Sequence, residues 1–149
     1  MPTSSRTAHA LRCLAAAGAI RLFVACTPTP PDRRVSAHGN IYWGPKYAQC
    51  AGALLRGFAE QLKPRDPELR TEYVVFTEAV SQKPKKSILS CPEYDCDNVA
   101  KAPLDAITKT QRIWVDDKQV GFLLSCKRWA APGEEAGVHV VVNILHPEG

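Results

Sequence analysis

Two glutamates, one arginine and one histidine lie in segments of the sequence that have the pattern of β-strands. Glu72 and Glu78 lie near the ends of one such segment, Arg112 lies within the next, and His139 lies within the last. Together on one sheet face, a glutamate would take the proton of a ribose 2′-hydroxyl, the arginine would hold the phosphate, and the histidine would protonate the leaving oxygen. These residue types therefore indicate RNA cleavage through a cyclic phosphate. Ion pairing between neighbouring strands accounts for the glutamates and the arginine equally well.

The clearest element that would position these residues is a helix over residues 46–62. Pro45 suits the first turn of a helix, where its missing N–H group costs nothing, and Pro64 stops the helix. Apolar residues recur at spacings of three and four and form one stripe: Tyr47, Cys50, Ala51, Leu54, Leu55, Phe58, Ala59 and Leu62. We expect this stripe to pack on a sheet.

Runs of β-branched and aromatic residues predict strands over 35–43, 72–77, 110–116, 119–126 and 138–145. A tight turn at Asp116-Asp117-Lys118 joins two of them into a hairpin. The Lys-, Pro- and Ser-rich segment 81–104 is predicted to be a long loop. The order of elements predicts an α+β fold in which one helix packs on an antiparallel sheet of four to five strands.

The N-terminal segment 1–26 has the pattern of a secretory signal peptide: a basic start, a short apolar stretch and small residues before a Pro-rich segment. We expect residues 27–37 to be a flexible linker and residues 38–149 to form a single domain. Cleavage after Ala25 or Cys26 would release a secreted, extracellular protein. An alternative is a bacterial lipoprotein acylated at Cys26, which would be the only attachment to a membrane.

Charge and motifs exclude several classes of function. The 149-residue chain has a net charge of +4, but three of its arginines and none of its acids lie in the predicted signal peptide. The remaining chain is close to neutral, so bulk charge gives no reason to expect binding to nucleic acid or membranes. The sequence has no glycine motif for nucleotides, no Gly-x-Ser-x-Gly and no His-Glu-x-x-His. We therefore expect no cofactor and no metal ion.

Four of the six cysteines follow the predicted signal peptide, and an even number in a small exported domain is typical of two disulfides. Three pairings are possible. We favour Cys50–Cys126, which joins the helix to a late strand, together with Cys91–Cys96, which closes a short loop. In the chain-entropy model the longer loop contributes about 4–5 kcal/mol.

The segments 102–104, 111–115 and 119–123 resemble the C-terminal part of the fungal secreted guanyl-specific ribonucleases. That resemblance implies one helix on an antiparallel sheet, a disulfide that closes a long loop, and a phosphate-contacting role for Arg112. Effector-like proteins of plant-pathogenic fungi share this scaffold, often without the catalytic residues. The catalytic histidine of the family is absent here, because Ser125-Cys126-Lys127 stands in its place. The resemblance therefore implies the scaffold without the enzyme.

Two further readings stay open beside the ribonuclease. The order of elements is also similar to the cystatin-like fold of protease inhibitors, although the inhibitory loop of cystatins is missing. The preferred interpretation is a small secreted, non-catalytic binding protein that acts as a monomer on a host protein or RNA. Aromatic residues are enriched in binding hot spots, and the expected contact residues are Trp43, Tyr94, Trp129 and Arg112. Trp114 is expected to pack in the core.

Overall fold

The computed structural model describes residues 2–146, with the side chains of residues 6–146. Its helices are α1 (Pro2–Ala15), α2 (Pro45–Gln61), α3 (Cys96–Thr110) and the short 3-10 helix η1 (Asp117–Gln119). Its strands are β1 (Ile20–Ala25), β2 (Arg33–Val35), β3 (Ile41–Trp43), β4 (Tyr73–Ser81), β5 (Val120–Trp129) and β6 (Gly137–Ile144). The predicted α+β class is confirmed, but the number of helices and the sheet type differ from the prediction.

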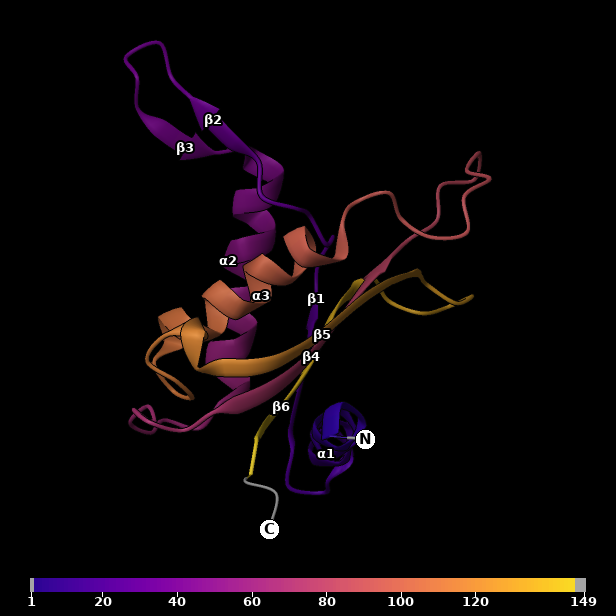
Figure 1. The fold of residues 1–149 in the computed structure, drawn as a ribbon. Helices are drawn as coiled ribbons and strands as arrows, with labels where there is room; N and C mark the ends of the chain where they lie inside the picture. The colour runs from indigo at the N-terminus through magenta and orange to yellow at the C-terminus, as the bar shows by residue number, and fades with distance from the viewer. Residues whose placement is uncertain (1, 147–149) are drawn as a thin grey trace.

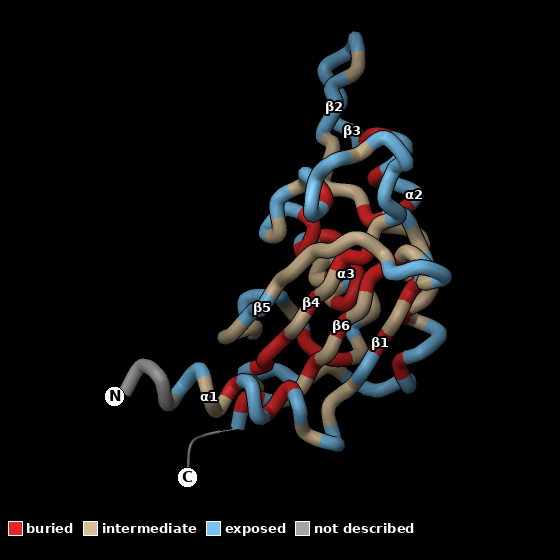
Figure 2. The backbone as a smooth tube through the Cα atoms, turned by 90° about the vertical axis from the view of Figure 1, so that its right-hand side faces the viewer, coloured by how far each residue is buried: buried red, intermediate tan, exposed pale blue. Residues whose placement is uncertain are grey.

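The main sheet is mixed and has four strands in the order β1-β6-β4-β5. Strand β6 pairs antiparallel with both β1 and β4, whereas β4 and β5 run parallel. Parallel strands need a crossover connection, and α3 lies in the chain between β4 and β5. Strands β2 and β3 form a separate two-stranded ribbon that extends away from the main sheet (Figures 1 and 2).

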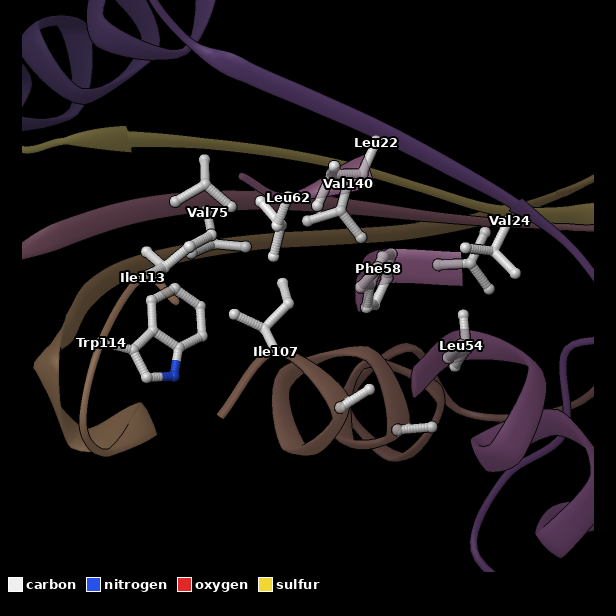
Figure 3. Close-up of a cluster of buried hydrophobic side chains, with 14 of the residues drawn as sticks. Leu22, Val24, Leu54, Phe58, Leu62, Val75, Ile107, Ile113, Trp114 and Val140 are labelled. Atoms are coloured by element: carbon white, nitrogen blue, oxygen red, sulfur yellow. The ribbon is translucent and has the colours of Figure 1, made fainter. Parts of the chain in front are cut away.

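Helices α2 and α3 cover one face of the sheet, and α1 lies on the other face (Figure 1). The larger core fills the space between the sheet and the two helices, and Figure 3 shows its labelled side chains, among them Phe58, Ile107, Trp114 and Val140. Trp114 is fully buried, which confirms its predicted core position. A smaller core joins α1 to the opposite face through Cys13, Leu14 and Val74.

The predicted helix over 46–62 is confirmed as α2, which begins at Pro45. Its buried residues Tyr47, Cys50, Leu54 and Phe58 belong to the predicted apolar stripe. The side of α2 that carries Gly57 lies against β1, because a Cβ atom at Gly57 would stand 2.4 Å from Cγ2 of Val24. Glycine is therefore required for this close approach of helix and strand.

The predicted loop over 81–104 is confirmed for residues 82–95, but it was wrong from residue 96 on, since α3 spans Cys96–Thr110. The predicted strand over 110–116 was also wrong, because residues 111–116 form turns and bends after α3. Pro103 argued against a helix because a proline inside a helix removes a hydrogen bond and crowds the preceding turn. In the structure Pro103 is buried within α3, on the same side as Val99, Ala106 and Ile107. The burial of this apolar stripe outweighs the local cost of the proline.

The predicted hairpin across residues 110–126 was also wrong. Residues Asp116–Gln119 form the cap and body of η1, and β5 then runs parallel to β4. The side chain of Asp116 accepts a hydrogen bond from the main-chain N–H of Lys118, which starts a helical turn in place of a two-residue β-turn. The hydrogen bond from Lys118 to Asp116 thus favours η1 over a β-turn. The chain then enters β5 parallel to β4.

The segment predicted to be a signal peptide contains an ordered strand of the main sheet. Residues Ile20–Ala25 form β1 at one edge, where Leu22 and Val24 are buried in the larger core. Cleavage after Ala25 or Cys26 would remove this strand, and the signal peptide stays a prediction. Among the described residues, the helices are all too short or too polar to cross a bilayer.

The two predicted disulfides are absent, and all six cysteines are free thiols. Cys50 lies beside Cys26 instead of Cys126, and their two thiols are hydrogen-bonded. The thiol of Cys126 donates to Oε2 of Glu78 at 3.5 Å. The pairing was mispredicted because the parallel arrangement of β4 and β5 places Cys126 opposite Glu78, away from α2.

Candidate active site

The four residues predicted to cleave RNA do not form one group. Glu78 and His139 are cross-strand neighbours on β4 and β6. Glu72 pairs with Arg6 of α1 at 2.6 Å. Arg112 donates from Nη1 to the main-chain oxygens of Leu62, at 3.0 Å, and Ala59. Arg112 therefore holds the C-terminal end of α2, where the last carbonyl groups of a helix need donors.

The cation beside Glu78 is Arg128 and not Arg112. The guanidinium of Arg128 lies 3.2 Å from Glu78 and makes two hydrogen bonds to Glu134, of 2.6 Å and 2.7 Å. The bonds from Arg128 lower the pKa of Glu134 to about 2. His139 packs its ring against Phe23, with 4.5 Å between the ring centroids. This group is an ion-pair network on the face of the sheet that α1 partly covers.

The predicted contact residues serve different purposes. Tyr94 shares a 2.7 Å hydrogen bond with Ser81, and Trp129 donates from Nε1 to the main-chain oxygen of Leu89 at 2.9 Å. Both aromatic residues thus attach the segment between β4 and α3 to the sheet. Trp43 is exposed on the β2–β3 ribbon. Its role in binding stays a prediction.

A second set of charged residues lies along α3 and η1, and the sequence analysis did not single it out. Asp97, Lys101 and Asp105 follow one another at intervals of four residues, so they lie on one face of α3. η1 packs on α3 and brings Asp117 within electrostatic range of Lys101 and Asp105. We call Asp97, Lys101, Asp105 and Asp117 the α3–η1 acidic face.

The pKa of Asp117 is raised, first because the carboxyl group is partly removed from water. The neighbouring carboxyl group of Asp116 raises the pKa further by a hydrogen bond and by its charge, and Asp105 adds to this effect. Lys101 acts in the opposite direction. The pKa of Asp116 is lowered because the main-chain N–H of Lys118 and the carboxyl group of Asp117 bond to it. Two adjacent carboxyl groups with divergent pKa values are typical of acid–base sites.

The signal for this face was present in the sequence. It consists of Asp95-x-Asp97 and the pair Asp116-Asp117, two short acidic motifs. The first was placed in a disulfide-bound loop and the second in a hairpin turn. Only the docking of η1 against α3 shows that Asp117 lies near Lys101 and Asp105 of α3.

A sequence model of the family "Endodeoxyribonuclease RusA" matches residues 25–143. The match covers about four fifths of the chain, including β4, α3, η1, β5 and nearly all of β6. The chain belongs to the RusA family. No curated protein matches the chain.

Family membership overturns the function that was predicted from the sequence. The chain is related to endodeoxyribonucleases and not to the fungal guanyl-specific ribonucleases. The interpretation as a disulfide-stabilised effector was therefore wrong, as were the ribonuclease and cystatin-like alternatives. The predicted extracellular location and the acylation of Cys26 in a lipoprotein stay predictions. The predicted monomer and the host-protein or RNA partner likewise conflict with this family.

Proposed function

We propose that this protein is an endodeoxyribonuclease that resolves four-way (Holliday) DNA junctions as a dimer, and that the α3–η1 acidic face is its cleavage site. The family match over residues 25–143 carries the proposal. The matched region includes the whole acidic face. This face also has the carboxyl groups and the cation that hydrolysis of a phosphodiester requires.

The chemistry assigns a role to each kind of group. In hydrolysis a water oxygen forms a new bond to phosphorus, the bond from phosphorus to the leaving sugar oxygen breaks, and the attacking water loses a proton. Asp117 is suited to accept that proton, because its raised pKa makes it a stronger base than an ordinary carboxylate. Lys101 is suited to offset the negative charge that builds on the phosphate.

Many nucleases hold divalent cations with carboxylates, and the oxygen atoms of the aspartates are ligands that Mg²⁺ prefers. Within residues 2–146, however, no three acidic, histidine or cysteine side chains lie close enough together to hold a metal ion. The acidic face is therefore not a preformed metal site. Asp97 in particular stands at the N-terminal end of α3, two helical turns before Asp105.

Cleavage of a synthetic four-way junction tests the proposal. The full chain is incubated, in buffer containing Mg²⁺, with a junction labelled on each strand in turn, and the products are separated on a denaturing gel. We expect paired cuts that release two duplexes from the junction, with little cutting of a linear duplex of the same sequence or of single-stranded RNA.

The variants Asp117→Asn and Asp97→Asn keep the shape of the side chain and remove its charge. We expect Asp117→Asn to lower the cleavage rate by about 10²-fold or more, the usual size of a general-base effect, and Asp97→Asn to lower the rate as well. Asp66→Asn is the matched control, because Asp66 is an exposed aspartate outside the acidic face. Cleavage at the wild-type rate by both acidic-face variants, or no cleavage by the wild-type chain, would contradict the proposal.

A further inference from the structure

The β2–β3 ribbon presents apolar side chains to solvent on a part of the fold that has no core of its own. All six strand residues are exposed, and Val35, Ile41, Tyr42 and Trp43 are each between 42% and 65% exposed. An isolated two-stranded ribbon is marginally stable in water, and a cluster of exposed apolar side chains commonly marks a binding surface. The tip of the ribbon extends away from the sheet and helices in both views (Figures 1 and 2).

The ribbon is fixed at its base and closed at its tip. The ring of Trp43 packs on the ring of buried Tyr47 in α2, with 4.8 Å between the centroids. The main-chain N–H of Gly44 donates to the main-chain oxygen of Asp32 at 2.7 Å. At the tip, the N–H of Asn40 donates to Oγ of Ser36 at 3.1 Å, and Gly39 takes a positive φ of 81°. The α2 helix therefore sets the direction in which the ribbon projects.

The charges of the ribbon point to a polyanion. Arg33 and Arg34 are exposed on β2, and Lys46 follows β3 at the start of α2. The single acid in this stretch, Asp32, is paired with Arg34 at 2.9 Å. Arginine and lysine neutralise phosphates, a two-stranded β-ribbon fits the major groove of B-DNA, and exposed aromatic rings stack on unpaired bases.

The ribbon also begins beside the acidic face. A small cavity of about 90 Å³ is lined by Trp43 and Tyr47 on one side and by Asp105 and Lys109 of α3 on the other. Burial raises the pKa of the Tyr47 hydroxyl group, and the nearby charge of Asp105 raises it further. DNA that lies on the acidic face would therefore continue onto the ribbon.

From these observations we propose that the β2–β3 ribbon is a DNA-binding arm, in which Arg33 contacts the phosphate backbone and Tyr42 stacks on an unpaired base at the branch point. This inference rests on the proposed function, since it assigns to the same substrate a second contact surface outside the cleavage site. The arm holds the DNA next to α3 and takes no part in bond cleavage.

Binding of the full chain to a fluorescent four-way junction tests the arm. Fluorescence anisotropy is recorded over a series of salt concentrations, in the presence of EDTA, which removes the Mg²⁺ of the cleavage buffer. We expect Arg33→Ala to lower the slope of log affinity against log salt by about 1, because one phosphate contact is lost. We expect Tyr42→Ala to weaken binding by about fivefold or more, the effect of one lost stacking contact.

Two control variants distinguish a loss of DNA binding by the arm from a loss of cleavage at the acidic face. Arg12→Ala removes the same charge from an exposed position on α1, on the other face of the sheet, and should leave affinity and salt slope unchanged. Asp117→Asn should lower the cleavage rate by about 10²-fold or more and retain binding. A wild-type chain that neither binds nor cleaves the junction would refute the proposed function itself.

A wild-type chain that binds and cleaves, together with Arg33→Ala and Tyr42→Ala variants of unchanged affinity and slope, would refute the arm alone. Light scattering on the same samples measures the oligomeric state, because the ribbon could instead bind a second copy of the chain. If the arm variants bind weakly because a wild-type dimer has become a monomer, the ribbon is a subunit contact and the DNA assignment is overturned. Circular dichroism should show native folding of both variants, since the two side chains are exposed.

Discussion

At the scale of single residues, the pKa of Asp117 is raised first by partial burial and then by the carboxylates around it. The charge of Asp105 disfavours the ionised form of Asp117, whereas Lys101 favours it. Removing the charge of Asp105 should therefore lower the pKa of Asp117. If Asp117 is the base in cleavage, the rate falls as the pH drops through this pKa, because the protonated carboxyl group cannot accept a proton.

The variant Asp105→Asn tests this coupling. We expect the acid limb of the pH–rate profile for junction cleavage to move to lower pH, since the pKa of Asp117 falls when a neighbouring negative charge is removed. Single-turnover rates between about pH 4 and pH 8 measure the limb. Lys101→Met should move it in the opposite direction. An acid limb that stays in place in both variants would assign the proton transfer to another group.

The thiols of Cys26 and Cys50 differ in acidity because one donates a hydrogen bond to the other. That bond lowers the pKa of Cys50 to about 7, against the cost of burial, and the main-chain N–H of Thr29 contributes in the same direction. The pKa of Cys26 is raised, because its proton is held in the bond to Cys50 and because the thiol is removed from water. Both cysteines line a pocket of about 610 Å³ together with Lys46 and Arg56.

Alkylation of Cys50 should therefore depend on pH differently from that of Cys126. Only the thiolate reacts, so the rate at Cys50 should rise about tenfold per pH unit up to a midpoint near pH 7 and then level off. Burial and Glu78 raise the pKa of Cys126 to about 11, so its rate should still be rising at pH 9. Mass spectrometry after timed exposure to a small alkylating reagent measures both. Cys26→Ala should move the Cys50 midpoint upward; an unchanged midpoint would exclude the thiol–thiol bond as the cause.

At the scale of secondary structure elements, Arg112 joins the C-terminal end of α2 to the segment that follows α3. Its guanidinium donates to the main-chain oxygens of Ala59 and Leu62, and its own main-chain oxygen accepts a 2.6 Å bond from Nε of Arg65. A hydrogen bond with a charged partner contributes about 1.5–3 kcal/mol. The residue that was predicted to contact phosphate therefore has a structural role.

The variant Arg112→Met keeps most of the side-chain bulk and removes the donors. We expect a loss of about 1.5–3 kcal/mol in the free energy of unfolding, measured by urea titration of the full chain. Arg70→Met, at an exposed position, should change the free energy by less than about 0.5 kcal/mol. Equal midpoints for the two variants would mean that Arg112 does not stabilise α2.

The elements differ in how far the sequence could predict them. Helix α2 was predictable because its apolar stripe, Pro45 and Pro64 all indicate the same state. Helix α3 was missed because Pro103 and the polar residues before it outweigh a short stripe that is convincing only once it packs on the sheet. The parallel pairing of β4 with β5 depends on that same crossover helix, so one missed helix also changed the predicted topology and the predicted cysteine pairs.

The acidic face could be predicted only in part for the same reason. Asp116 and Asp117 are adjacent in the sequence and visible as a motif, but their relation to Asp97 and Asp105 depends on η1 packing against α3. Glu78, Arg112 and His139 formed a chemically plausible group because each lay in a strand-like segment. The pairing of β4 with β6 makes Glu78 and His139 neighbours, whereas Arg112 lies outside the sheet.

At the scale of the whole molecule, the N-terminal segment contributes to both faces of the sheet. α1 packs on one face, and β1 closes the edge of the sheet with six residues paired to β6. Leu22 and Val24 of β1 are buried, and burial of each side chain contributes roughly 1.5–3 kcal/mol. Loss of β1 would also expose the side of α2 that carries Gly57, which has no side chain to cover the core.

Two truncations separate these contributions and test the predicted cleavage of a signal peptide. A chain that lacks residues 2–18 loses α1 but keeps β1, and should unfold cooperatively in urea at a lower midpoint than the full chain. A chain that lacks residues 2–26 also loses β1, and we expect no cooperative transition, because the burial of Leu22 and Val24 is a large part of the 5–15 kcal/mol by which a domain is stable. Cooperative unfolding of the shorter chain at the midpoint of the longer one would show that β1 is dispensable. The segment before Thr27 would then be free to act as a leader that is removed, and the fold would begin at the β2–β3 ribbon.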